Sequence, residues 1–77
     1  MTLTLEQIFA DVFVVPLVGI HDDLQLREIT SWDSMSHMML IMRLEESFNV
    51  QLTGDQIADI KSVGDARNAL RTQGVKL

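Results

Sequence analysis

The chain has 77 residues, no cysteine and a formal charge of −5 at pH 7. A chain of this length forms one small domain that buries a little over ~60% of its unfolded surface, so we expect a single domain over residues 1–77. The absence of cysteine excludes disulfides, thiolate nucleophiles and cysteine-ligated zinc, and it fits a reducing, cytoplasmic compartment. The acidic balance argues against nucleic acid as a partner, because phosphates require a Lys/Arg surface.

Neither a leader nor a membrane span is predicted. The opening residues, MTLTLEQIF, contain no basic segment followed by an apolar run. The longest apolar run, VFVVPLVGI, is too short to cross a bilayer and is interrupted by Pro16. We therefore expect a monomer in the cytoplasm that associates with proteins and not with membranes.

The first helix is predicted from about Thr4 to Val14. Thr4 and Gln7 have the spacing of a capping box, and five apolar residues follow at helical spacing: Leu5, Ile8, Phe9, Val12 and Val15. Pro16 disfavours helix at the residue before it. The long connection that follows, PLVGIHDDLQLREITSW, is expected to carry a short turn or a function. Leu24, Leu26 and Ile29 are its candidate anchors to the core.

Three further helices are predicted. One begins at Asp33 or Ser34 and ends near Phe48. Thr53 with Gln56, and Ser62 with Asp65, have capping-box spacing and start two more, of which the first is short and the second stops at Gly74. No convincing strand pattern competes. The predicted fold class is all-α: a small four-helix bundle of three longer helices and one short helix, with a long loop between the first two.

The second helix carries two apolar stripes. At ~100° per residue, four methionines fall on one side of the helix; they are called the methionine stripe here and comprise Met35, Met38, Met39 and Met42. The opposite side carries Leu40, Ile41, Leu44 and Phe48, whose well-defined rotamers suit a core. The methionine stripe is therefore predicted to be exposed and to bind partners, because exposed apolar patches mark interaction sites and methionine adapts to varied surfaces. Alternatively, helices cover both stripes.

Ser34 lies where the second helix begins. Free backbone N–H groups and the helix dipole favour a phosphate there, although an N-cap is the better explanation of Ser34 taken alone. His37 follows three residues later, as in a Ser–His pair, but no Gly-x-Ser-x-Gly elbow accompanies it. We expect His37 to be hydrogen-bonded and partly buried, and Trp32 to pack as a lid over helix ends. Lys61, Arg67 and Arg71 are expected on a plain exposed face.

The segment WDSM, followed by LIMRLEESFNVQLTGDQIADIKSVGDA, resembles the acyl carrier protein family. In that family an Asp-Ser-Leu or Asp-Ser-Met motif opens the second helix, and its serine bears a 4′-phosphopantetheine taken from coenzyme A. The resemblance covers nearly the whole chain, including its helix order. WDSM looks most similar to free-standing carriers of polyketide-type or other specialised pathways, although carriers of peptide synthetases have similar cores.

The resemblance implies a role for each matching position. Ser34 matches the modified serine, and Asp33 the acidic residue that contacts the phosphopantetheinyl transferase. Met35, Met38 and Met42 match positions that dock on partners such as ketosynthases or acyltransferases. The other matching positions are the acidic pair Glu45 and Glu46 and the short-helix residue Ile57. Met39 departs from the pattern, because fatty-acid carriers commonly have glutamate there; with Arg43 nearby, this puts exchange with fatty-acid synthase enzymes in doubt.

Two other functions stay open from the residues alone. The chain could be an unmodified helical adaptor that binds one protein through the methionine stripe, with Ser34 only capping. A hydrolase using Ser34 and His37 is a more distant alternative. The resemblance implies a carrier without catalysis of its own, which holds acyl groups as thioesters and moves them between enzymes of a polyketide, fatty-acid-like or specialised-metabolite pathway.

Overall fold

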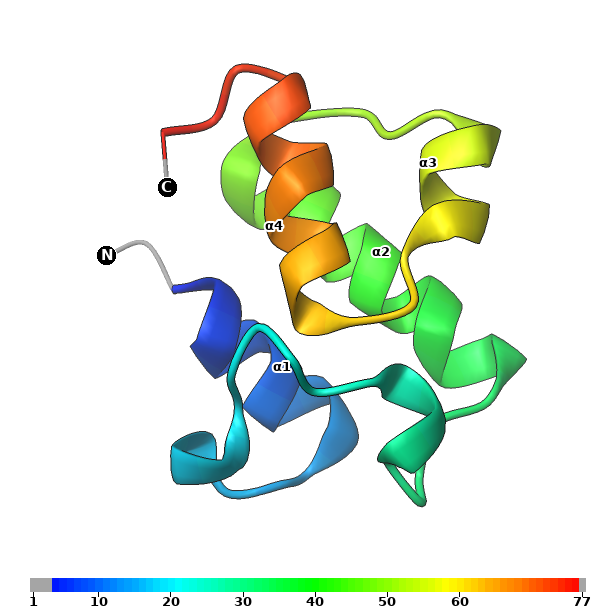
Figure 1. The fold of residues 1–77 in the computed structure, drawn as a ribbon. Helices are drawn as coiled ribbons and strands as arrows, with labels where there is room; N and C mark the ends of the chain where they lie inside the picture. Colours follow the sequence, from blue (N-terminus) through cyan, green and yellow to red (C-terminus); the bar gives the residue numbers. More distant parts are fainter. Residues whose placement is uncertain (1–3, 77) are drawn as a thin grey trace.

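The computed structural model describes residues 4–76, and within them the chain is helical, with no strand (Figure 1). Four α-helices follow one another: α1 (Leu5–Phe13), α2 (Ser34–Phe48), α3 (Gly54–Asp59) and α4 (Val63–Thr72). Two 3₁₀ turns, η1 (Leu17–Gly19) and η2 (Leu26–Glu28), interrupt the long connection between α1 and α2. The predicted fold class of three longer helices plus one short helix is confirmed. None of the helices in residues 4–76 is long and apolar enough to cross a membrane.

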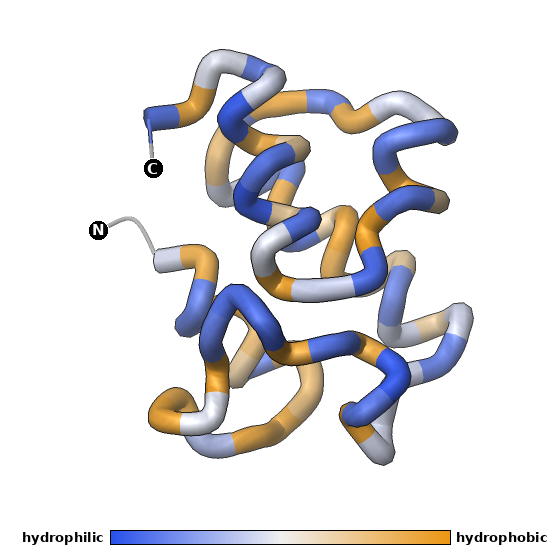
Figure 2. The backbone as a smooth tube through the Cα atoms, in the orientation of Figure 1, coloured by the Kyte–Doolittle hydropathy of each residue, from blue (hydrophilic) through white to orange (hydrophobic). Residues whose placement is uncertain are grey.

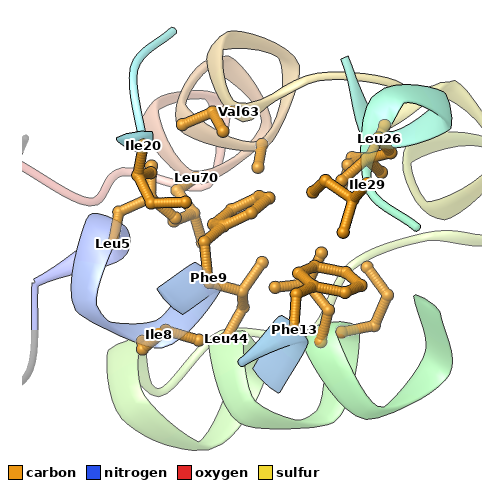
Figure 3. Close-up of a cluster of buried hydrophobic side chains, with 14 of the residues drawn as sticks. Leu5, Ile8, Phe9, Phe13, Ile20, Leu26, Ile29, Leu44, Val63 and Leu70 are labelled. Carbon is orange, nitrogen blue, oxygen red and sulfur yellow. The ribbon is translucent and has the colours of Figure 1, made fainter. Parts of the chain in front are cut away.

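The core lies where α1, α2 and α4 meet (Figure 3). Phe9 and Phe13 form its centre, with ring centroids 6.0 Å apart. Figure 2 shows the helices as mixtures of apolar and polar residues, as one-sided burial requires. The remaining buried apolar side chains of the helices are Leu5 and Ile8 from α1, Leu40, Ile41 and Leu44 from α2, and Val63, Ala66 and Leu70 from α4. The predicted core stripe of α2 is thus confirmed, with Phe48 partly buried at its end.

The end of α1 differs from the prediction. Phe13, absent from the predicted apolar set, is fully buried, whereas Val15 lies beyond the helix. Four residues separate Phe13 from Phe9, so one helical turn brings both rings to the same face. Val14 ends α1 in the left-handed conformation, with φ 55° and ψ 52°. Its backbone N–H bonds to Ala10 O, which satisfies a carbonyl of the last turn.

The long connection is held against the linker between α3 and α4. The amide of Leu26 donates to Lys61 O at 2.9 Å, and the amide of Val63 donates to Leu24 O at 3.1 Å. Gly64 donates to Asp22 O at 3.0 Å, and a Cβ on Gly64 would lie only 3.1 Å from that oxygen, so glycine permits the approach. Leu26 and Ile29 are buried and Leu24 packs against the core, as predicted.

Arg67 corrects the expectation of a plain exposed face on α4. Its guanidinium pairs with Glu6 of α1 and, at 3.1 Å, with Asp22 of the long connection. The side chain is only 16% exposed. These contacts, led by the hydrogen bond to Glu6, raise the pKa of Arg67 above its ordinary value. Arg67 therefore ties three segments together.

The cap of α4 also differs in detail. Ser62 accepts a hydrogen bond from the amide of Asp65, as predicted, but the Asp65 carboxylate accepts from the amide of Lys61 at 3.1 Å. The amide of Ser62 therefore does not take part in a reciprocal capping box. Asp65 instead fixes the residue before the cap, at the point where the linker meets Leu26.

Candidate functional site

The first turn of α2 is fixed by Asp33 and Ser36. The Asp33 carboxylate accepts from the amide of Ser36, and the amide of Asp33 donates to Ser36 Oγ, both at 2.8 Å. These contacts form a capping box in which Asp33 is the N-cap. The backbone hydrogen bond from Ser36, followed by that from its hydroxyl, lowers the pKa of Asp33. Asp33 is thus held ionised at the positive end of the helix dipole.

Ser34 is the first residue of α2 and not its cap. It is exposed, and its hydroxyl has no hydrogen-bond partner among residues 4–76. The explanation of Ser34 as a simple N-cap is therefore wrong, because Asp33 already fills that role. A pocket of about 380 Å³ opens beside it, called the serine pocket here and lined by Trp32, Ser34, His37, Met38, Ala58, Ile60 and Lys61.

His37 bridges Trp32 and α3. The indole N–H of Trp32 donates to Nδ1 of His37 at 3.2 Å, and Nε2 of His37 lies 3.0 Å from Ile57 O. An indole nitrogen only donates and a carbonyl only accepts, so the ring is the neutral tautomer with hydrogen on Nε2. Both ring nitrogens are thereby engaged, which leaves neither to take a proton from Ser34. The prediction that His37 is hydrogen-bonded and partly buried is therefore confirmed.

The methionine stripe is open to solvent. Its members are 48–76% exposed, whereas Leu40, Ile41 and Leu44 on the other side are at most 1% exposed. The alternative in which helices cover both stripes is therefore wrong. α3 lies near the N-terminal part of α2, but on the side of His37, so it leaves the stripe uncovered.

The two predicted acidic residues differ in their surroundings. Glu46 is exposed, whereas Glu45 is half-buried and its Oε2 accepts from the amide of Leu52 at 2.8 Å. Glu45 thus helps to hold the link between α2 and α3, a structural role that sequence spacing did not indicate. Ile57 is half-buried and packs against the core. Arg43 pairs with Asp11 of α1 at 2.9 Å.

Sequence reasoning missed three residues of the serine pocket. Ala58, Ile60 and Lys61 come from the end of α3 and the linker to α4, more than twenty residues beyond Ser34. No local pattern indicates them, because only the packing of α3 beside α2 brings them to Ser34. The 3.0 Å contact between His37 and Ile57 O is one measure of that packing. Residues 4–76 contain no group of three or more His, Cys, Asp or Glu residues that could hold a metal ion.

Comparisons with known proteins agree on the fold and the family. The sequence model of the family described as "Phosphopantetheine attachment site" matches residues 4–70. The structure is similar to the holo acyl carrier protein from Geobacter metallireducens, solved in solution by NMR, with a TM-score of 0.79 and 29% identity over 90% of this chain and 79% of that one. A putative acyl carrier protein from Mycobacterium tuberculosis shares the fold, with a TM-score of 0.76 and 23% identity over 90% and 97% of the two chains. Because the family match spans most of its length, this chain belongs to the phosphopantetheine attachment site family, whose cofactor is 4′-phosphopantetheine.

Proposed function

We propose that this protein is an acyl carrier, with 4′-phosphopantetheine attached to Ser34. The observation that carries the proposal is the state of the Ser34 hydroxyl, which is exposed and without a hydrogen-bond partner among the described residues. It is the first residue of a helix whose cap is supplied by Asp33. A hydroxyl in this position is accessible to a transferase and is not needed to hold the helix.

The surroundings of Ser34 fit the proposed group. A phosphodiester on Ser34 Oγ lies at the positive end of α2, where the dipole contributes about 0.3–1 kcal/mol. The serine pocket beside it has apolar walls from Met38, Ala58 and Ile60, and Lys61 is its cation. When bound, the group supplies a thiol that holds acyl cargo as a thioester. Trp32 and His37, fixed to each other and to α3, keep this pocket in shape.

The chain supplies no reaction of its own in this proposal. A phosphopantetheinyl transferase with Mg²⁺ joins Ser34 Oγ to the phosphorus of coenzyme A that bears pantetheine, while the pyrophosphate bond breaks and adenosine 3′,5′-bisphosphate leaves. The serine proton passes to the transferase. His37 cannot accept that proton while it bonds to Trp32 and Ile57 O. Activation of Ser34 is thus assigned to the other enzyme.

Partner enzymes are proposed to dock on the exposed side of α2. Asp33 would contact the transferase, and the methionine stripe would contact acyl-loading and acyl-processing enzymes such as acyltransferases or ketosynthases. Glu45, Glu46 and Ile57 complete the proposed surface, with Glu46 the more accessible acid. A small apolar stripe with an acidic rim suits weak, quickly reversed binding, because a shuttle must leave each enzyme after transfer. The exposed Met39 and the paired Arg43 favour a polyketide-type or other specialised pathway over fatty-acid synthesis.

Intact-protein mass spectrometry tests the proposal. The chain is incubated with coenzyme A, Mg²⁺ and a broad-specificity transferase, and a gain of one phosphopantetheine is expected. Ser34→Ala should abolish the gain. Ser36→Ala is the matched control: it disturbs the capping box but keeps Ser34, so it should still be modified. If both variants lose the modification, the transferase would require the intact helix end, and the result would not identify Ser34 as the attachment site.

The adaptor remains the second candidate, favoured by the exposure of all four residues of the methionine stripe, which does not depend on Ser34. It predicts that a folded, unmodified chain captures one partner and that Ser34→Ala binds as tightly as the natural sequence. If several transferases produce no mass gain, the adaptor would be favoured over the carrier.

A further inference from the structure

A second pocket is also lined by Trp32. This side pocket has a volume of about 260 Å³ and is lined by Gln25, Leu26, Arg27, Trp32 and Lys61. It shares Trp32 and Lys61 with the serine pocket. The two pockets therefore adjoin at Trp32 and Lys61, with Ser34 on the lining of one and Arg27 on the lining of the other.

The two cations of the side pocket, Arg27 and Lys61, have no ion-pair partner among the residues that the structure describes. The chain has 11 acidic and 6 basic side chains. Arg43 and Arg67 are committed to carboxylates, whereas Arg27 and Lys61 make no ion pair with any residue between 4 and 76. Two unpaired cations on one pocket of an acidic protein mark a place where an anion is stabilised.

Two carboxylates that neighbour these cations in sequence, Glu28 and Asp65, are engaged by backbone amides. Glu28, beside Arg27, accepts from the amide of Gln25 at 3.2 Å and so holds the η2 turn. Asp65 accepts from the amide of Lys61 at 3.1 Å. Each of these acids bonds to backbone instead of pairing with the neighbouring cation. The backbone geometry thus keeps Arg27 and Lys61 available to a ligand.

Leu26 and Trp32 give the side pocket apolar walls, and Gln25 adds one polar side chain. Leu26 is buried beneath the pocket, and the indole of Trp32 forms a wall that His37 holds in place. A pocket that combines two apolar walls with two cations suits a ligand with an apolar stem and an anionic end. A carboxylate meets Arg27 with the strength of a charge-assisted hydrogen bond, which a methyl end lacks.

We propose that the side pocket binds the terminal carboxylate of the acyl cargo, so that this carrier is adapted to acyl groups derived from dicarboxylic acids. The proposal rests on the proposed function, because the cargo reaches the side pocket from Ser34. The phosphate attached to Ser34 is a second source of the same negative charge. The test therefore compares a chain without cargo with chains carrying charged and neutral cargo.

Trp32 reports directly on the side pocket, because it is the only tryptophan of the chain. Three forms are prepared with a transferase and confirmed by mass: the holo protein, the hexanoyl form and the adipoyl form, whose acyl chains have equal length. Fluorescence quenching by acrylamide then measures access to Trp32. We expect the adipoyl form to be protected relative to both others, with amide NMR shifts at residues 25–27 and 60–61.

Charge-neutral variants identify the binding groups. Arg27→Gln and Lys61→Gln should each move the docked-to-free equilibrium of the adipoyl form about tenfold toward the free form, the change that ~1.4 kcal/mol produces. Lys76→Gln, which removes one charge from the C-terminal segment, is the matched control and should leave protection unchanged. Arg27 and Lys61 are exposed, so these variants are expected to fold.

The outcomes separate this inference from the proposed function. Equal quenching of the hexanoyl and adipoyl forms would overturn the side-pocket inference while leaving the carrier function standing. An Arg27→Gln effect as large in the holo form as in the adipoyl form would assign the cations to the phosphate and overturn it as well. Failure to load Ser34 at all would overturn both.

Discussion

The indole N–H of Trp32 donates to Nδ1 of His37 at 3.2 Å, with the two rings edge to face and their centroids 6.1 Å apart. The other ring nitrogen of His37 reaches Ile57 O. One side chain of α2 thus fixes both the residue before its own cap and the short helix α3. The walls of the serine pocket depend on this connection.

Replacing His37 by Phe should release Trp32 without unfolding the protein. Phe preserves the ring volume but removes both hydrogen bonds, so we expect a loss of about 1–2 kcal/mol in the free energy of unfolding. Trp32 emission should shift to longer wavelength as the indole gains water. His21→Phe, on the exposed loop, is the control and should leave the emission unchanged. An unchanged spectrum in His37→Phe would show that packing alone holds Trp32.

Replacing Arg67 should destabilise the fold more than replacing Arg43. Both arginines pair with carboxylates, but the Arg67 side chain is 16% exposed and that of Arg43 is 36% exposed. Arg67→Gln removes two ion pairs that join α1, the long connection and α4, and we expect a loss of about 1–2 kcal/mol. Arg43→Gln should cost no more than about 0.5 kcal/mol. Urea unfolding measures the free energy of unfolding of both variants. Equal losses would contradict the conclusion that Arg67 holds the three segments together.

Val14→Asn should stabilise the protein. Val14 occupies the left-handed region, where a β-branched residue is strained by about 1–2 kcal/mol and asparagine much less. Asn49 already ends α2 in the same conformation, with φ 54°. We expect a gain of about 1 kcal/mol in urea unfolding. Val18→Asn is the control, because Val18 is 92% exposed, close to the 87% of Val14, but does not have a positive φ. This variant should change stability little. A gain in both variants would indicate a solubility effect.

Stability should depend on the charge of Asp33. Because the pKa of Asp33 is lowered in the folded state, its contribution is present above the ordinary titration range of aspartate and is lost as pH falls through the lowered value. Asp33→Asn keeps a good N-cap but cannot ionise. The natural protein should therefore exceed Asp33→Asn in stability at neutral pH, with the difference shrinking on acidification. Parallel urea stabilities across that range would contradict this.

Met38→Glu should impair docking and leave the fold intact. Met38 is 48% exposed, so circular dichroism should not change and the free energy of unfolding should move by no more than about 0.5 kcal/mol. Acyl transfer to a partner enzyme should slow by roughly tenfold, as expected for the loss of one apolar contact of ~1.4 kcal/mol. Asn68→Glu adds the same charge to exposed α4 and should not slow transfer. Loss of helix content in Met38→Glu would place Met38 in the core.

The sequence by itself determined the helices and the two apolar stripes of α2. Capping residues such as Thr4, Asp33 and Thr53 act within a few residues of themselves, so their spacing reveals where a helix begins. The period of α2 likewise separates a core stripe from the methionine stripe, because both follow from 3.6 residues per turn.

Only the tertiary structure decided what surrounds Ser34. Lys61 and Trp32 line the serine pocket and the side pocket together. Elsewhere, Arg67 pairs with Glu6, which lies 61 positions earlier in the sequence, and Glu45 accepts a hydrogen bond from the amide of Leu52. These contacts depend on how the long connection and α3 pack on α2, which no local pattern encodes. Local hydrogen bonds and periodicity therefore specify the elements, whereas the packing of side chains from distant segments creates the serine pocket and the ion pairs between segments.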